Sequence, residues 1–152
     1  MLVRVISLDP GVTTGYCIAD LEDNFVSLDP CQDELDHRGI YDALLESRPD
    51  YIVCEDFEYR PGQARDYVVL VSLEYIGIVR LFAAVAEAKL SMQKASEGKG
   101  YFTNDKLKEL GVYKRGVPHG MDALRHMMHW FTFKAGYGLT EGKAQFKLYE
   151  GE

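Results

Sequence analysis

The chain has 152 residues, 47% of them hydrophobic and 27% charged, which fits one globular domain with a single substantial core. Its formal net charge of −7 argues mildly against a nucleic-acid-binding protein. The charge is uneven, however, because residues 1–58 hold 14 acidic and 3 basic side chains, whereas residues 89–115 hold seven basic and three acidic ones. A local basic surface of this kind can still contact phosphate.

Cysteine usage and hydropathy indicate a cytoplasmic protein without a membrane partner. Cys17, Cys31 and Cys54 have no CxxC spacing, which favours reduced thiols over a disulfide framework or a zinc site. The N-terminus lacks a signal-peptide pattern. The long apolar stretch at 67–88 contains charged residues, so we do not expect it to span a membrane.

The pattern of apolar runs and turn residues predicts an α/β protein with a mixed sheet. Strands are expected at 2–8, 14–19, 24–28, 51–54 and 90–93, and helices at 33–47, 66–89, 103–110 and 118–134. Residues 94–101 are expected to form a flexible basic loop. We expect the domain to cover 1–135 and a polar, flexible tail to cover 136–152.

The predicted helix at 66–89 is apolar around most of its circumference. One face of a sheet cannot bury all of that surface. Either a dimer interface or a thicker fold that covers both sides of the helix would explain the pattern, and the sequence leaves both open.

Two predicted strands end in an acidic residue. Asp9 follows the apolar run of the first strand, and Glu55 follows the run at 51–54. If these strands are parallel neighbours, both acids emerge at the same sheet edge, where α/β folds place their chemistry. A turn-forming role for Asp9, beside Pro10 and Gly11, is the competing interpretation.

The last predicted helix adds two candidate site residues. His119 and Asp122 are spaced i, i+3 and therefore share a face in its first turn. With Asp9 and Glu55 they would form a carboxylate-rich site that suits Mg²⁺ or Mn²⁺. Two such ions about 4 Å apart can activate water and stabilise the leaving oxygen of a phosphodiester. An exposed helix start with a capping acid is the simpler interpretation of the spacing alone.

Three groups of residues together resemble the RuvC-like Holliday-junction resolvases of the ribonuclease H-like superfamily. The matching motifs, in chain order, are Ile6-Ser7-Leu8-Asp9-Pro10-Gly11 with Thr14-Gly15-Tyr16, then Ile52-Val53-Cys54-Glu55, then His119-Gly120-Met121-Asp122-Ala123-Leu124. The resemblance runs from residue 2 to about 131. It implies a ribonuclease H-like fold, with a mixed five-stranded sheet flanked by helices.

The resemblance also implies an activity, a cofactor and a partner. The expected enzyme is a crossover junction endodeoxyribonuclease that uses Mg²⁺ or Mn²⁺, with two ions per site, to hydrolyse a backbone phosphodiester of branched DNA and leave a 5′ phosphate. Asp9, Glu55 and Asp122 take the family's metal-binding positions. His119 takes the fourth, which is aspartate in many members and histidine in others, so its role stays open. Family members are commonly homodimers, and the 94–114 segment resembles phage and prophage members, which act in the bacterial or host cytoplasm.

Several further residues are candidates for contact with DNA. Phe57 and Tyr59 follow Glu55, where family members have an aromatic residue that stacks on bases, although either ring could simply pack beneath the loop. The expected phosphate contacts are Arg60, Lys94, Lys99, Lys114 and Arg115. His126 and His129 continue the helix stripe of His119, and we expect both to be solvated.

Three other functions remain possible from the sequence. A YqgF-like ribonuclease H-fold protein acting on RNA would share the early aspartate and the glycine turn. An actin-like or sugar-kinase-like nucleotide binder has a phosphate loop that also reads Asp-x-Gly-x-Thr-Thr, but it normally needs two such domains. A DNA-binding protein that does not cleave would not need the complete set of acids.

Overall fold

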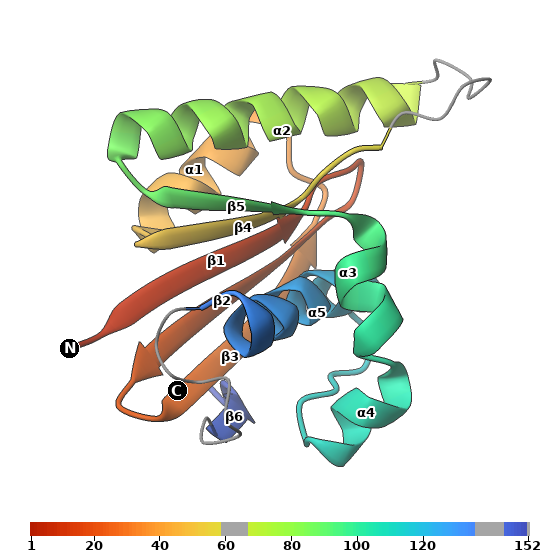
Figure 1. Cartoon of the computed structure of the whole chain (residues 1–152). Helices are drawn as coiled ribbons and strands as arrows, with labels where there is room; N and C mark the ends of the chain where they lie inside the picture. The colour runs from red at the N-terminus through yellow and green to blue at the C-terminus, as the bar shows by residue number, and fades with distance from the viewer. Residues whose placement is uncertain (59–66, 136–144, 152) are drawn as a thin grey trace.

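A computed structural model describes residues 1–58, 67–135 and 145–151 of the chain (Figure 1). Its elements, in chain order, are β1 (Val3–Asp9), β2 (Thr14–Glu22), β3 (Phe25–Asp33), α1 (His37–Ser47), β4 (Tyr51–Glu55), α2 (Tyr67–Ala86), β5 (Lys89–Gln93), α3 (Ala95–Tyr101), α4 (Asn104–Glu109), α5 (Pro118–Phe133) and β6 (Gln145–Leu148). The predicted strands and long helices are all present, with the largest shift at the end of β3, which lies at Asp33 where residue 28 was expected.

The strands form one mixed sheet in the order β5-β4-β1-β2-β3-β6. β1 pairs antiparallel with β2 and parallel with β4, so it lies between the two segments that contain the predicted acids. The predicted mixed α/β sheet flanked by helices is confirmed. The sheet has six strands, however, where the sequence predicted five.

The sixth strand corrects the interpretation of the C-terminal segment as a polar, flexible tail. β6 pairs parallel with β3, and Phe146 packs against Phe131 with ring centroids 6.0 Å apart. β3 extends to Asp33, beyond the expected end at residue 28, and β6 pairs with its first four residues, Phe25 to Leu28. Residues 145–148 therefore belong to the sheet, although their alternating polar side chains are typical of an exposed edge.

Helices cover both faces of the sheet (Figure 1). α1 and α2 lie on one face, and α5 crosses the other with α3 and α4 beside it. The buried residues form two apolar clusters, one for each face. The first includes Ile6, Leu8, Ile52 and the inner side of α2, and the second includes Val5, Val53 and the apolar side of α5. Consecutive residues within β1, and likewise within β4, thus point to opposite faces of the sheet, as the two-residue period of a strand requires.

α2 is apolar enough in length and composition to cross a membrane, yet one side of it is buried in the protein. Val71, Tyr75 and Val79 pack into the cluster beneath it. The opposite side exposes a stripe of large apolar residues, Leu70, Leu73, Leu81 and Val85. The predicted excess of apolar surface is therefore real, and no described element covers this stripe.

The expected flexible loop at 94–101 is a helix, which corrects that prediction. α3 begins after Lys94, whose backbone N–H donates to Glu97 Oε1 at 3.1 Å. Two glycines give this segment a low helix propensity. Packing against α5 compensates, because Gly98 lets the two helices approach closely: a Cβ there would lie 3.0 Å from His126 Nδ1. Tertiary contact, which local sequence does not reveal, stabilises this helix.

Candidate metal centre

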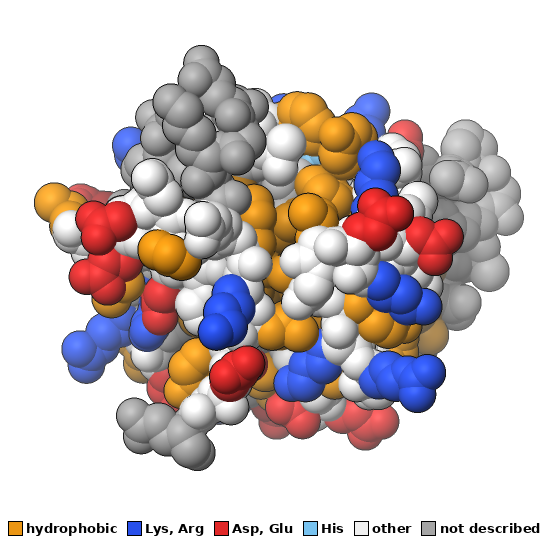
Figure 2. All heavy atoms as spheres, turned by 90° about the horizontal axis from the view of Figure 1, so that it is seen from below, with side chains coloured by type: hydrophobic (Ala, Val, Ile, Leu, Met, Phe, Trp, Pro, Cys, Tyr) orange, Lys and Arg blue, Asp and Glu red, His pale blue; other side chains and the backbone are white. Residues whose placement is uncertain are grey.

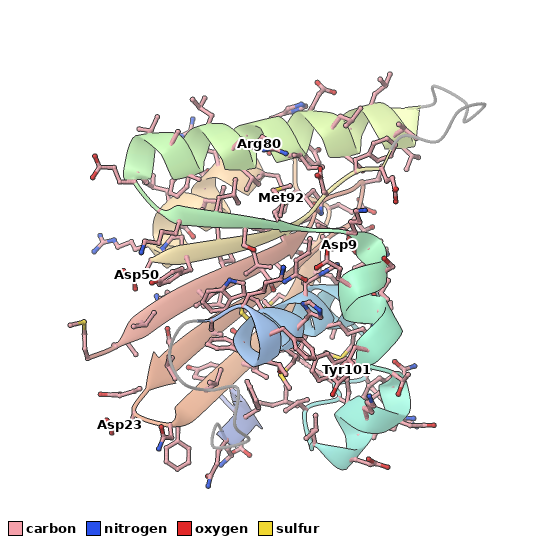
Figure 3. The ribbon with its side chains drawn as sticks, viewed as in Figure 1. Asp9, Asp23, Asp50, Arg80, Met92 and Tyr101 are labelled. Atoms are coloured by element: carbon pink, nitrogen blue, oxygen red, sulfur yellow. The ribbon has the colours of Figure 1, made fainter. Side chains whose placement is uncertain are left out.

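Asp9 and Glu55 lie at the same edge of the sheet, as predicted from the two strand ends. In the parallel pairing of β1 with β4, Leu8 is opposite Cys54, so each acid follows directly after a paired residue. The two carboxyl groups are close enough to hydrogen-bond. Figure 3 shows Asp9 where β1 ends, beside α3.

α5 brings His119 and Asp122 to this edge because its first turn lies directly on β2 and β3. A Cβ on Gly15 of β2 would collide with the backbone of His119, and a Cβ on Gly120 would lie 2.8 Å from the carbonyl oxygen of Cys31. The backbone N–H of His119 donates to Gln32 Oε1 at 2.9 Å. Gly15 and Gly120 therefore allow the start of α5 to pack closely on β2 and β3, and the side chain of Gln32 accepts a hydrogen bond from its first turn.

Asp9, His119 and Asp122 each present one possible metal-ligand atom, and these atoms all lie within 4.8 Å of one another. Glu55 is not one of these three residues, but its carboxyl group contacts that of Asp9, and its buried Oε1 makes no hydrogen bond among the described residues. Carboxylates with one imidazole form a donor set that suits Mg²⁺ or Mn²⁺. These residues fit the expected metal, with His119 exposed at the rim.

The acids of the cluster share protons unequally. Burial, together with the hydrogen bond and charge of Glu55, raises the pKa of Asp9 to about 9. Burial would also raise the pKa of Glu55, but the contacts with His126 and Asp9 and the charge of Lys99 lower it to about 2. At neutral pH and without metal, Asp9 and Glu55 therefore share one proton and carry one negative charge between them.

Two cations face the carboxylates. Lys99 Nζ of α3 lies 3.4 Å from Glu55 Oε1 and 3.6 Å from Asp122 Oδ2. Arg125 Nη1 donates to Asp122 Oδ1 at 2.9 Å, and the same guanidinium donates to the carbonyl of Phe102 at 2.8 Å. Lys99 thus occupies a position between two candidate ligands, as a cation would, whereas Arg125 holds Asp122 from the side of the helix.

His126 is fully buried, which corrects the prediction that it is solvated. The stripe of α5 that contains His119 and Asp122 does reach His126, but α3 covers it there. His126 Nε2 lies 3.5 Å from Glu55 Oε1, and its Nδ1 lies 2.8 Å from Gln93 Oε1 of β5. Sequence reasoning missed both His126 and Gln93, although the spacing of His126 from Asp122 placed it on the correct side of the helix. His129 is partly buried, and burial lowers its pKa.

Two adjoining hollows meet at Asp9. One, of about 360 Å³, is lined by residues that include Glu55, Asp56 and Phe57, and the other, of about 300 Å³, by residues that include His119. Asp9 and Pro10 line both. The candidate metal centre is therefore open to an extended ligand that passes over the end of β1.

The other predicted contact residues are more dispersed. Phe57 is partly buried, packs on the apolar cluster beneath α2 and lines the larger hollow. Tyr59 and Arg60 lie outside the described residues. Lys94 and Arg115 are exposed.

Lys114 lies beside β3, with its ammonium 3.5 Å from the carbonyl oxygen of Pro30. On the face seen in Figure 2, basic side chains alternate with acidic ones and with exposed apolar ones. Basic side chains therefore do not form one continuous surface on that face.

No family model matches the sequence, and no curated protein matches it significantly. Solved structures do. T. thermophilus RuvC in complex with Holliday junction substrate matches with a TM-score of 0.60 at 14% identity, over 85% of this chain and 92% of that one. A second Thermus thermophilus RuvC structure gives a TM-score of 0.57 at 17% identity, over the same shares of the two chains.

The yeast mitochondrial Holliday junction resolvase Ydc2 matches with a TM-score of 0.60 at 14% identity, over 84% of this chain and 77% of that one. At these identities of 14–17% the likeness concerns the fold. The expected resemblance to the RuvC-like resolvases is confirmed at that level: the chain has their ribonuclease H-like fold.

Proposed function

We propose that this chain is a divalent-metal-dependent endonuclease that cleaves branched DNA, with Holliday junctions as its substrate. The main support is the cluster of Asp9, His119 and Asp122, whose ligand atoms lie within 4.8 Å of one another. Glu55 joins the cluster through its contact with Asp9. The protein that carries this cluster has a fold similar to that of RuvC, one structure of which contains a Holliday junction substrate.

The four site residues would hold Mg²⁺ or Mn²⁺, two ions per site. Such ions supply Lewis-acid activation of water and neutralise charge at the phosphodiester. The protein's part is to hold the acids in place and to lose the proton on Asp9, which metal binding requires. The ammonium of Lys99 is near enough to contact a phosphate oxygen once the carboxylates are engaged otherwise.

The hollows on both sides of Asp9 provide a path for the DNA backbone. Phe57 lines one of them, and we assign it the stacking contact with a base near the cleaved phosphate. Tyr59 and Arg60 follow it in the chain. We assign the remaining phosphate contacts to the basic residues Lys94, Lys99, Lys114 and Arg115.

A homodimer fits both the substrate and the exposed surface. A four-way junction has two-fold symmetry, and a two-fold dimer would present two equivalent sites to it. The stripe on α2 offers a self-complementary apolar surface, in which Leu81 is 66% and Val85 77% exposed.

A cytoplasmic location agrees with the three cysteines, none of which forms a disulfide.

The decisive experiment incubates the protein with a labelled synthetic four-way junction and Mg²⁺ or Mn²⁺, beside a matched linear duplex and an RNA substrate. Paired, symmetric nicks in the junction alone are expected. Cleavage of RNA instead would favour the YqgF-like alternative. Junction binding without cleavage would indicate a structure-specific DNA-binding protein, and nucleotide binding in place of both would indicate the actin-like one.

Glu55→Gln and Asp56→Asn form a matched pair of variants for this assay. Both lie at the end of β4 and line the same hollow, but Asp56 is exposed and faces Arg80 at 3.9 Å. Glu55→Gln should abolish cleavage and leave junction binding largely intact, because it removes one candidate ligand charge. Asp56→Asn should cleave almost as well as the wild type. The reverse result would show that the site is wrongly assigned.

A further inference from the structure

Two buried polar atoms face each other behind the candidate metal centre. His126 Nε2 and Glu55 Oε1 are 3.5 Å apart, and within the described residues neither makes a well-aligned hydrogen bond, although the Lys99 ammonium lies 3.4 Å from the same Glu55 oxygen. Buried polar atoms in folded proteins are nearly always paired, so an orphaned pair of this kind needs an explanation. The imidazole of His126 is completely buried, and it therefore approaches Glu55 from the protein interior.

The orientation of this imidazole is set by Gln93. The side-chain amide of Gln93 donates to the backbone carbonyl of His126 at 3.2 Å, which leaves its Oε1 to face His126 Nδ1 at 2.8 Å. Both ends of the amide are thus engaged by the same residue, and Nδ1 is the donor in the second contact, so Nε2 can donate to Glu55 only in the doubly protonated ring, in which both nitrogens are donors. The ring can satisfy Gln93 only by turning Nε2 toward Glu55.

The sheet and the neighbouring helix hold the pair in place. Gln93 is directly opposite Glu55 in the pairing of β4 with β5, so both side chains leave the sheet at one level. Gly98 of α3 lies over the ring, where even a Cβ would come within 3.0 Å of Nδ1. The imidazole therefore has neither the space to rotate nor contact with solvent.

We propose that Gln93 and His126 form a positioning pair that holds Glu55 in the orientation needed to bind a divalent cation. The assignment rests on the proposed function, since that function makes Glu55 a metal ligand. Lys99 reaches the same oxygen from the solvent side and is 42% exposed, so it is free to leave, whereas His126 is not. Outer residues that orient metal ligands typically contribute about 10–100-fold to metal affinity.

The test measures Mn²⁺ binding to the full chain without DNA, by the electron paramagnetic resonance signal of free Mn²⁺, together with thermal unfolding. His126→Leu should weaken Mn²⁺ binding about 10–100-fold. His126→Gln should recover most of that loss, because its amide nitrogen can approach Glu55 as Nε2 does. Gln93→Leu keeps the imidazole but releases its orientation, and should also weaken binding.

His129→Leu serves as the control, since it removes a second imidazole from α5, one that is only partly buried. It should leave Mn²⁺ affinity unchanged. A folded His126→Leu variant with wild-type affinity would overturn the proposal, and so would equal weakening by His129→Leu. If His126→Leu does not fold, Gln93→Leu decides the matter by the same criterion.

The readout separates this proposal from the proposed function. A wild-type chain that binds Mn²⁺ at a site lost in Asp9→Asn, yet cleaves no branched DNA, would refute the nuclease, and the Mn²⁺ affinities of the variants would still decide the role of the pair. A wild-type chain that binds no Mn²⁺ would overturn the positioning pair as well.

Discussion

Gly15→Ala should damage the candidate metal centre although Gly15 binds nothing itself. A Cβ at this position would lie 1.8 Å from the carbonyl oxygen of His119 and 2.9 Å from the backbone nitrogen of Gly120. Ordinary contact needs about 3.5 Å, so the start of α5 would have to move by roughly 1.5 Å. The obstacle is helix backbone, which cannot rotate away as a side chain can.

The displacement cannot be absorbed locally, because α5 is fixed at three points near its start. Gly120 is closely packed on Cys31, the backbone of His119 is bonded to Gln32, and Ser7 Oγ donates to the carbonyl of Ala123 at 2.6 Å. Overpacking of this kind typically costs about 1–3 kcal/mol of stability. A misplacement of about 1 Å at a catalytic group can cost about 100-fold in rate.

The assay combines thermal unfolding, Mn²⁺ affinity and cleavage of a four-way junction. Gly11→Ala, in the turn between β1 and β2, is the control. A Cβ at Gly11 would lie 3.4 Å from the carbonyl oxygen of Thr13 and 3.8 Å from Ser72 Oγ, both ordinary contacts. The Gly11→Ala variant should unfold and bind Mn²⁺ as the wild type does. A Gly15→Ala variant with unchanged stability and Mn²⁺ affinity would refute the claim that this glycine sets the position of α5.

Three further predictions follow from the charges and the exposed surface. Asp9→Asn should abolish Mn²⁺ binding but raise the unfolding temperature of the metal-free protein. The pKa of Asp9 is raised to about 9, so its contribution to stability is present at low pH and is lost as the pH rises toward 9. The increase in unfolding temperature of Asp9→Asn over the wild type should therefore be largest near pH 9. Thermal melts in EDTA from pH 5 to 9 would measure it. Lys99→Met should tighten Mn²⁺ binding up to about fivefold, because the ammonium of Lys99 competes with the metal for Glu55 and Asp122. An exposed ion pair is worth about 0.2–1 kcal/mol, which sets that limit. Weaker Mn²⁺ binding by the variant in a titration would contradict the competition. Leu81→Glu should convert a dimer into a monomer in sedimentation equilibrium, and a monomeric wild type at micromolar concentration would exclude α2 as a dimer interface.

The strand ends and the first turn of the last helix were predictable because each depends on short-range pattern. An apolar run that stops at an acid gave Asp9 and Glu55, and the i, i+3 spacing gave His119 and Asp122. The parallel pairing of β1 with β4 then brought the two acids to one edge. Gly15 was recognised only as part of a motif, since its physical role depends on where α5 crosses β2.

What the sequence concealed depends on packing between distant segments. α3 contains two glycines and has little helical tendency of its own, so its formation follows from the contact of Gly98 with α5. The burial of His126 has the same cause, because α3 covers the stripe that would otherwise face solvent. β6 pairs across more than a hundred residues of chain with β3, and its four residues show no strong strand pattern.

The position of Lys99 would reconcile an acidic chain with the proposed DNA substrate. Its ammonium lies among the carboxylates of Glu55 and Asp122, and the charges of Glu55, Asp122 and Asp9 together raise its pKa against the effect of burial. Without metal, the site is thus partly neutralised by the protein itself. If metal takes over that neutralisation, the ammonium becomes available to a phosphate of the proposed substrate. On that proposal, the local balance of charge at the site matters more for DNA binding than the net charge of −7.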